Sequence, residues 1–302
     1  MSTWLANTTL AHLRDVAEWP DVGERYEVTR RLGRGGMGVV YGARDRVLDR
    51  EVAIKVLDAV DPGGGLSRRL QQEARILARL EHPGIVPVHD AGALADGRVF
   101  YVMKLVRGDR LDAALDTNTS LAERLELFLR ICDAVSFAHA HGVVHCDLKP
   151  ANVMRGRYGE VLVMDWGVAK VMLREADTDD RITGTPGFMA PEQARGAQDV
   201  VDARTDVYAL GVILEGMLSG PVPRALAAVS VRAHAEPIGD RYPSVAALAA
   251  EIARFRDGQP VAAYRESLLE RLIRVYRRHR LPILLVLAYM VMRVLLLMWQ
   301  GV

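Results

Sequence analysis

Residues 33–38 read Gly-Arg-Gly-Gly-Met-Gly and match the phosphate-loop pattern G-x-G-x-x-G. The pattern alone is a weak signal, because loops that bind dinucleotides carry it as well. A dinucleotide loop opens a helix, whereas residues 39–41, Val-Val-Tyr, continue as a strand. We therefore expect a hairpin that covers phosphates, with glycines that let backbone N–H groups approach phosphate oxygens closely. These glycines are Gly33, Gly35, Gly36 and Gly38.

A lysine on the next strand makes the pattern specific. Residues 52–55 read Val-Ala-Ile-Lys, and at this spacing they resemble the nucleotide-binding strand of the protein kinase family. The resemblance implies that Lys55 contacts the α- and β-phosphates of ATP and pairs with an acid on the following helix. Glu73 is the candidate for that acid. A solvated surface side chain is the alternative for either residue alone.

The strongest match to the family lies at residues 145–152, His-Cys-Asp-Leu-Lys-Pro-Ala-Asn, which are similar to the catalytic loop H-R-D-L-K-P-x-N. Phosphoryl transfer needs a carboxylate that orients the substrate hydroxyl and accepts its proton, a cation near the transferred phosphoryl group and an oxygen ligand for metal. The resemblance gives these roles to Asp147, Lys149 and Asn152. Lysine two positions after the aspartate resembles the serine/threonine branch, and His145 is expected to be structural.

Residues 165–167, Asp-Trp-Gly, stand where the family has D-F-G. The resemblance implies that Asp165 holds Mg²⁺, or Mn²⁺ in its place, between the β- and γ-phosphates, because hard cations prefer carboxylate oxygen. Tryptophan in place of phenylalanine leaves this carboxylate intact and changes only the packing partner.

Residues 190–192, Ala-Pro-Glu, resemble the end of the activation segment. The preceding stretch, 184–189, resembles the turn that docks substrate, and the resemblance places Thr185 between Asp147 and Lys149. Two further positions match scaffold residues of the family: Asp206, and Arg241 as the partner of Glu192.

The resemblance also implies a slot for adenine with hydrogen bonds from the backbone of residues 104–106. The apolar residues expected to line the slot are Val40, Ala53, Met103 and Met154. Each of them is also compatible with an ordinary core position.

Two departures from the family alter these expectations. Cys146 replaces the arginine that in many kinases pairs with a phosphorylated residue of the activation segment. We therefore expect that phosphorylation of Thr178 or Thr183 is not obligatory for activity. The stretch 221–239 is shorter than its counterpart in the family, which includes a helix for substrate and partner docking. This second departure concerns substrate recognition more than phosphoryl transfer.

The elements that must position these residues fall into two groups. Residues 26–106 alternate apolar and polar side chains in short runs, which predicts a mostly antiparallel sheet, interrupted by a helix at 70–80. Apolar residues then recur three and four positions apart, which predicts helices at 121–141, 202–219 and 244–257.

The expected fold is therefore α+β and bilobal, with a β-rich lobe followed by a larger α-rich lobe, as in protein kinases. The expected division is an N-terminal extension at 1–25, the first lobe at 26–106, the second lobe at 107–258, a basic juxtamembrane segment at 259–280 and a transmembrane helix at 281–299.

The run at 281–299 is almost entirely apolar. Its length is close to the roughly 20 residues that a helix needs to span a bilayer. Only Arg293 interrupts it, and the many aliphatic residues outweigh one arginine. A buried C-terminal helix of the globular domain is the alternative. Arginines precede the run at positions 271, 274, 277, 278 and 280, so by the positive-inside tendency the bulk of the chain is expected in the cytoplasm.

The bulk composition agrees with a folded cytosolic domain. The chain has 302 residues, of which 50% are apolar and 25% charged, and its formal net charge of +1 gives no general reason to expect nucleic acid. Two cysteines cannot form a disulfide framework. The first ten residues lack the basic and apolar regions of a secretory signal.

Taken together, the motifs are similar to those of bacterial, membrane-anchored serine/threonine kinases of the eukaryotic-like type. The resemblance implies ATP-dependent phosphorylation of protein Ser/Thr hydroxyls, including autophosphorylation, at a plasma or inner membrane. A pseudokinase scaffold is the runner-up, although Lys55, Asp147, Asn152 and Asp165 are all retained. A kinase that acts on small molecules is a third possibility, but it would not explain the Ala-Pro-Glu sequence at residues 190–192. A homodimer formed through the membrane helix is one route by which a signal could enter.

Overall fold

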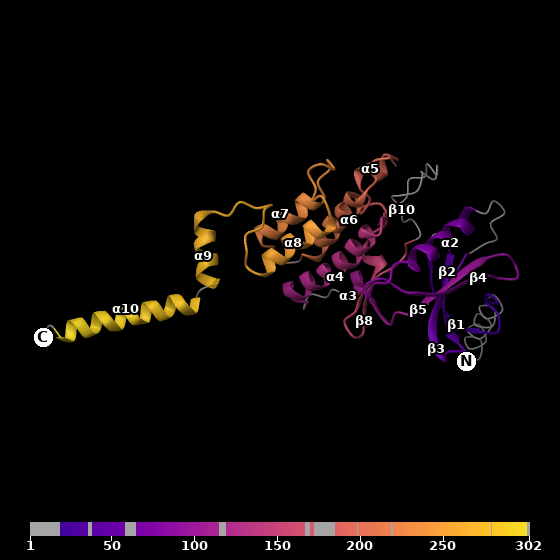
Figure 1. Cartoon of the computed structure of the whole chain (residues 1–302), viewed down its shortest axis with the longest axis horizontal. Helices are drawn as coiled ribbons and strands as arrows, with labels where there is room; N and C mark the ends of the chain where they lie inside the picture. Colours follow the sequence, from indigo (N-terminus) through magenta and orange to yellow (C-terminus); the bar gives the residue numbers. More distant parts are fainter. Residues whose placement is uncertain are drawn as a thin grey trace, which may run out of the picture.

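The computed structural model describes residues 19–35, 38–57, 65–114, 119–166, 170–171, 185–197, 199–218, 220–278 and 280–300. Figure 1 shows two lobes side by side and, beyond the second lobe, two helices that lead away from it. One lobe is built on a sheet and the other mainly on helices, so the expected α+β bilobal fold is confirmed.

A five-stranded sheet forms the first lobe, with the order β1-β2-β3-β5-β4 and antiparallel neighbours throughout. Alternation along β3 divides the sheet into two faces. Val52 and Ile54 pack into an outer cluster, whereas Ala53 belongs to the core shared with the second lobe. Lys55 follows Ala53 by two positions and therefore points to the same inner face. The strands are β1 (Tyr26–Gly35), β2 (Gly38–Asp45), β3 (Arg50–Val56), β4 (Val88–Ala93) and β5 (Val99–Lys104).

Helix α2 (Gly65–Leu77) packs against β4 and β5 through Leu70 and Leu77, which are both buried. It begins and ends earlier than the predicted 70–80. Residues 65–69 are mostly polar and small, so apolar periodicity could not reveal the first turn. At the other end the N–H of Leu80 bonds to the carbonyl of Leu77, an i→i−3 bond that tightens the chain into a turn.

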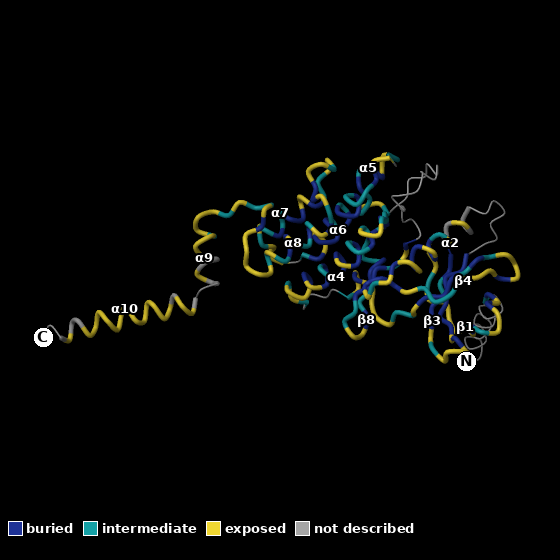
Figure 2. The backbone as a smooth tube through the Cα atoms, in the orientation of Figure 1, coloured by how far each residue is buried: buried dark blue, intermediate teal, exposed yellow. Residues whose placement is uncertain are grey.

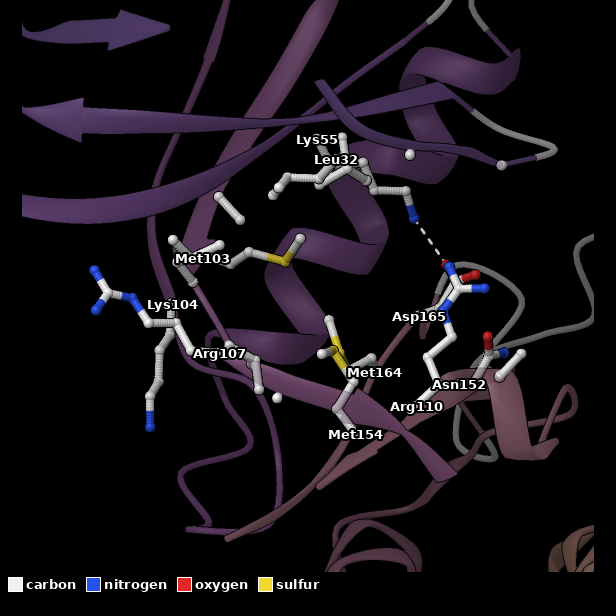
Figure 3. A pocket seen from close by; sticks show the side chains of 18 of the residues that line it. Leu32, Lys55, Met103, Lys104, Arg107, Arg110, Asn152, Met154, Met164 and Asp165 are labelled. Carbon is white, nitrogen blue, oxygen red and sulfur yellow. Dashed lines mark hydrogen bonds and ion pairs between the residues drawn. The ribbon is translucent and has the colours of Figure 1, made fainter. Parts of the chain in front are cut away.

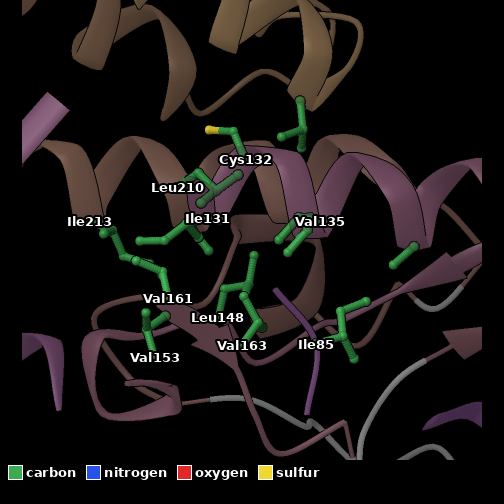
Figure 4. Close-up of a cluster of buried hydrophobic side chains, with 14 of the residues drawn as sticks. Ile85, Ile131, Cys132, Val135, Leu148, Val153, Val161, Val163, Leu210 and Ile213 are labelled. Carbon is green, nitrogen blue, oxygen red and sulfur yellow. The ribbon is translucent and has the colours of Figure 1, made fainter. Parts of the chain in front are cut away.

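The second lobe is assembled around α4 (Leu121–Ala140), which a capping box starts: Ser120 Oγ accepts from the N–H of Glu123, whose carboxylate accepts from the N–H of Ser120. The buried side of α4 faces the strand that leads into the site, and Figure 4 shows Ile131 and Val135 above Val163. The other elements are β6 (Gly108–Arg110), α3 (Leu111–Ala114), β7 (Val143–Val144), η1 (Pro150–Asn152), β8 (Val153–Gly156), β9 (Val161–Val163), β10 (Lys170–Val171), α5 (Pro191–Ala194), α6 (Ala203–Met217), α7 (Arg224–Ala233) and α8 (Val245–Arg256).

The three helices predicted for this lobe are present as α4, α6 and α8. Helix α4 starts as predicted and ends one residue early, α6 starts one residue late and ends two early, and α8 is one residue shorter at each end. Side-chain caps explain two of the starts. Asp202 accepts from the N–H of Arg204 at the start of α6, and Ser244 accepts from the N–H of Ala247 at the start of α8. A capping residue lies outside the helix that it begins, which accounts for the difference at these ends.

The short stretch 221–239 still contains a helix, α7, which packs closely on α6. A Cβ at Gly211 of α6 would lie 2.7 Å from the N of His234 and 2.8 Å from the Cβ of Ala233, so glycine is what permits the approach. Ser230 Oγ donates to the Gly211 carbonyl at 3.0 Å. The segment is therefore compact and well anchored despite its length.

The C-terminal part forms α9 (Leu268–Arg278) and α10 (Arg280–Gln300). Figures 1 and 2 show both helices leaving the second lobe, and Figure 2 colours the described residues of α10 as exposed. The alternative of a buried C-terminal helix is therefore wrong. Within the part of the chain that the structure describes, however, no helix is long and apolar enough to cross a membrane. The transmembrane helix expected at 281–299 is not supported by this finding and stays a prediction.

Candidate active site

A buried ion pair joins the sheet to α2. Lys55 Nζ donates to both carboxylate oxygens of Glu73, at 2.9 and 3.0 Å, and to Asp165 Oδ1 at 2.8 Å. Burial by itself lowers the pKa of Lys55, but the surrounding negative groups outweigh burial and raise it well above its ordinary value. Burial raises the pKa of Glu73 in spite of the lysine. Lys55 is therefore a fixed cation between the two lobes.

Tyr101 on β5 completes this pair, and the sequence reasoning missed it. Its hydroxyl donates to Glu73 Oε1 at 2.9 Å, and its side chain is only 2% exposed. The alternation along β5 was a usable signal, because it places Tyr101 on the same face as Met103. No spacing in the sequence connects Tyr101 with a helix residue 28 positions away.

Around Asp147 lies a second cluster, in the loop between β7 and η1. Lys149 Nζ donates to Asp147 Oδ2 at 2.7 Å and to Thr185 Oγ1 at 2.6 Å. Thr185 Oγ1 in turn donates to Asp147 Oδ1 at 2.8 Å. The contact expected for Thr185, which lies 38 positions from Asp147, is therefore present.

The amide of Asn152 shows which of its atoms remains available. Its Nδ2 donates to the carbonyl of Asp147 at 2.9 Å and to Asp147 Oδ2 at 3.2 Å. Because the nitrogen is used on Asp147, the amide oxygen is left for another partner. The Asp165 carboxylate lies 48% exposed at the same cavity, with one oxygen bonded to Lys55. Burial raises the pKa of Asp165, but the Lys55 ammonium outweighs burial and lowers it.

A cavity of about 600 Å³ lies between the two lobes, lined by Lys55 and Asp165 of the first cluster and by Asn152, which bonds to Asp147 of the second. Its lining includes all four residues predicted for the adenine slot, together with the backbone at 104–106. Figure 3 shows Met103 and Met154 on opposite sides of the space, with Lys55 and Asp165 at one end. Sequence reasoning missed Leu32, Met164 and the basic residues Arg107 and Arg110 at the rim.

The glycine-rich segment is a β1–β2 hairpin, as predicted, and its register pairs Gly35 with Gly38. At Gly38 an added Cβ would lie 2.1 Å from the carbonyl oxygen of Val56, so the neighbouring strand requires glycine there. At Gly33 an added Cβ would meet nothing within 4 Å, although this residue lines the cavity. No neighbouring protein atom requires glycine at position 33, so its missing side chain leaves space in the cavity for a bound group. Gly36 lies outside the described residues.

The comparisons with known proteins agree with this geometry. Residues 26–289 match the family model described as protein kinase domain. The chain belongs to the protein kinase family. Members of this family use ATP and a divalent metal, typically Mg²⁺.

Several relatives of the kinase are bacterial. It is 37% identical over 295 residues to serine/threonine-protein kinase PknB of Mycolicibacterium smegmatis, with 83% of this chain and 45% of the relative covered. It is 34% identical over 297 residues to serine/threonine-protein kinase PknD of Chlamydia caviae, with 78% and 32% covered. The crystal structure of the Mycobacterium tuberculosis PknI kinase domain superposes with a TM-score of 0.59 at 29% identity, covering 76% of this chain and 96% of that one. The kinase spans less than half the length of these two curated relatives.

The catalytic loop of the kinase is held by Asp206 of α6. The Asp206 carboxylate accepts from the backbone N–H of His145 at 2.8 Å and of Cys146 at 2.9 Å, and it contacts His139 Nε2 at 2.7 Å. Cys146 has a φ of 65°, a left-handed conformation that these bonds fix in place. Burial raises the pKa of Asp206, but the bond to His139 and the other donors outweigh burial and lower it.

His145 has the structural role expected of it. Its Nδ1 accepts from the N–H of Asp147 at 3.2 Å, so Nε2 carries the proton and donates to the carbonyl of Met164 at 3.0 Å. The ring also lies 4.5 Å from the Trp166 ring. Trp166 is 1% exposed, and its indole N–H donates to the Val163 carbonyl at 3.3 Å. The tryptophan thus packs against the catalytic loop, while the carboxylate of the neighbouring Asp165 lines the cavity.

The end of the activation segment is tied to the lobe by the expected pair of Glu192 and Arg241. Arg241 donates with both terminal nitrogens to the two Glu192 oxygens, at 2.7 and 2.8 Å, and Thr205 donates to the same carboxylate at 2.9 Å. Gln193 then donates to the carbonyl of Cys146 at 2.7 Å, which links α5 to the catalytic loop. Thr178 and Thr183 lie outside the described residues.

The described residues hold no cluster of three or more His, Cys, Asp or Glu suited to a metal ion. This agrees with the family's use of Mg²⁺, which binds through one or two protein ligands and the phosphates of the substrate. The side-chain oxygens of Asn152 and Asp165 fit such a partial site, because both residues line the cavity and each has an oxygen that the contacts above leave available.

Proposed function

We propose that this chain transfers the γ-phosphoryl group of ATP to serine and threonine hydroxyls of proteins, itself included. The observation that carries the proposal is that one cavity is lined by Lys55 and Asp165 of the Lys55–Glu73–Asp165 cluster and by Asn152, which bonds directly to Asp147 of the Asp147–Lys149–Thr185 cluster. The first cluster suits the phosphates of ATP. The second offers a carboxylate and a cation where an acceptor hydroxyl can approach.

The residues divide the chemistry among them. Asp147 orients the acceptor hydroxyl and takes its proton as the oxygen bonds to the γ-phosphorus, while the bond from that phosphorus to the bridging oxygen breaks and ADP leaves. Lys149 neutralises charge on the transferred group, while Lys55 fixes the α- and β-phosphates. Asn152 and Asp165 would hold Mg²⁺, which supplies charge neutralisation at the β- and γ-phosphates. Thr185 keeps the Asp147 carboxylate and the Lys149 ammonium at their working separation.

The test is transfer of labelled γ-phosphate from ATP and Mg²⁺ to the full chain and to a generic basic protein. We expect incorporation by the wild type and loss of it in Asp147→Asn and Lys55→Met. Asp199→Asn, an exposed aspartate away from the cavity, is the matched control and should retain activity. ATP binding without incorporation by the wild type would contradict the proposal and favour a scaffold that signals by binding alone.

We further propose that the kinase acts at the cytoplasmic face of a membrane, where residues 281–299 hold it. The support is the apolar sequence of this run, the exposure of its described side chains and the arginines that precede it. Fractionation of cells followed by extraction at alkaline pH tests this. Retention in the membrane pellet after extraction supports insertion of α10, release indicates attachment at the surface, and recovery in the soluble fraction before extraction contradicts the proposal.

A further inference from the structure

Helix α9 exposes a row of apolar side chains that no part of the described structure covers. Leu268 is 81% exposed, Leu269 and Leu272 are each 67% exposed, and Tyr276 is 49% exposed. With about 3.6 residues per turn, these four positions share one side of the helix. Figure 2 shows α9 apart from the packed helices of the second lobe. An exposed apolar surface of this kind indicates a site of interaction with a protein or a membrane.

The other side of α9 is basic. Between residues 268 and 280 the sequence has five arginines and a single acidic residue, Glu270. Helix geometry puts positions 271, 274, 277 and 278 across from the leucines. Glu270 is already engaged at the start of the helix, because its carboxylate accepts from the Tyr264 hydroxyl at 3.0 Å and from the N–H of Ser267 at 2.9 Å. The sequence of α9 therefore carries a net positive charge that an anionic partner would complement.

We propose that α9 lies along a bilayer surface, with its leucines in the acyl boundary and its arginines on the headgroups of anionic phospholipids. The proposal rests on the attachment of α10 to a membrane. A leaflet offers an apolar layer and an anionic layer within the depth of one helix, which matches the two sides of α9. Residues 268–280 of a second copy would cover the leucines but would bring five further arginines against a single acid, Glu270. A single residue separates α9 from α10 in the sequence, so attachment of α10 would bring α9 to the surface.

The test is amide hydrogen exchange on the full chain in lipid nanodiscs made either of phosphatidylcholine or of an equal mixture of phosphatidylcholine and phosphatidylglycerol. We expect the amides of 268–278 to exchange about tenfold more slowly in the anionic discs than in the neutral ones, and high salt to reduce the difference. Leu269→Glu with Leu272→Glu should abolish the protection. Val47→Glu with Leu48→Glu, two exposed apolar residues of the β2–β3 turn, is the matched control and should preserve it.

The possible outcomes distinguish failure of the proposal for α9 from failure of the proposed membrane attachment of α10. Equal exchange in the two kinds of disc overturns the inference for α9 while leaving insertion of α10 intact. Protection that depends on protein concentration in detergent without lipid identifies a second copy as the partner and also overturns it. Failure of the chain to enter discs contradicts the membrane attachment itself. Kinase activity is measured separately and does not enter this readout.

Discussion

At the scale of single residues, the motif positions were predictable and their supporting contacts were not. Lys55 and Glu73 follow from spacing that resembles a known family, because the chemistry of phosphate binding restricts residue type at those positions. Tyr101, His139 and Met164 had no such restriction. Each acts through a contact with a residue distant in the sequence, and a contact of that kind depends on strand register and helix packing that periodicity does not supply.

Tyr101 gives a first prediction. Tyr101→Phe removes the hydroxyl that donates to Glu73 and leaves that carboxylate with Lys55 alone. A hydrogen bond to a charged group contributes about 1.5–3 kcal/mol, so we expect a free energy of unfolding lower by about that amount and a higher KM for ATP. Urea unfolding and steady-state kinetics measure both. Tyr158→Phe, whose side chain is 97% exposed, is the control, and equal behaviour of the two variants would show that the bond to Glu73 is unimportant.

The two glycines of the hairpin should respond in different ways to the same change. Gly38→Ala places a methyl group 2.1 Å from the Val56 carbonyl oxygen and must push β2 from β3. Overpacking of this kind costs about 1–3 kcal/mol, so the melting temperature should fall. Gly33→Ala meets nothing in the protein, so its melting temperature should stay unchanged while the KM for ATP rises. A lower melting temperature for Gly33→Ala would mean that the hairpin, and not the nucleotide, requires this glycine.

At the scale of elements, types and order were predictable and boundaries were less so. The alternation of the strands and the apolar spacing of the helices gave the sheet and the helices now seen as α4, α6 and α8. Errors occurred where side chains outside the apolar pattern decide the ends. Polar residues begin α2, and Asp202 and Ser244 cap helices from outside. The 221–239 stretch was predicted to be shorter than in the family, and α7 fits within it because Gly211 permits close packing.

The Glu192–Arg241 pair fastens α5 to the lobe, and breaking it should be severe. Arg241→Leu leaves a buried carboxylate without its cation, which costs about 3–5 kcal/mol in similar cases. Adding Glu192→Gln removes the uncompensated charge and should recover part of the loss. Denaturant unfolding of the single and double variants measures the difference. A double variant no more stable than Arg241→Leu would mean that geometry, and not charge, decides the stability.

The same pair predicts how stability depends on pH. Burial raises the pKa of Glu192, but the bond to Arg241 outweighs burial and lowers it below its ordinary value of 4.5. A carboxyl group with a lowered folded-state pKa contributes stability that is fully present above the unfolded-state pKa and is lost as pH falls through the folded-state pKa. The stability difference between wild type and Glu192→Gln should therefore be constant near neutral pH and shrink below about 4.5. A difference that persists at lower pH would contradict the assignment.

The activation segment yields a prediction about regulation. Cys146 stands where many kinases have the arginine that attracts a phosphorylated residue, and its uncharged thiol donates to the Val144 carbonyl at 3.7 Å. Thr178→Ala with Thr183→Ala should therefore retain most of the peptide phosphorylation rate. Thr185→Ala, which removes a hydroxyl bonded to Asp147 and Lys149, should lose most of it. A similar loss in both variants would show that phosphorylation of the segment is required.

At the scale of the whole molecule, the two lobes and the C-terminal helices are separate parts of the structure. The described side chains of α10 are exposed along its length, and Figure 1 shows the helix extending away from both lobes. Sequence composition predicted this division, because the apolar run follows a basic segment outside the kinase motifs. Composition cannot say how the run meets a bilayer, since this depends on lipid that the chain itself does not contain.

This separation predicts which activities depend on α10. Leu287→Arg with Val291→Arg places two charges in the apolar run, which costs several kcal/mol of insertion free energy, about 2.5–3.5 per arginine at the centre of a span. If residues 281–299 hold the kinase at a membrane as proposed, the variant should leave it. The variant should still phosphorylate a soluble peptide with unchanged kcat/KM, because neither position lines the cavity. Autophosphorylation between copies should slow down, since confinement to a surface raises the local concentration of partners. Val47→Arg with Leu48→Arg on the β2–β3 turn is the matched control and should stay on the membrane. If peptide phosphorylation fell as far as autophosphorylation, α10 would act on the active site itself, and the two parts would be coupled.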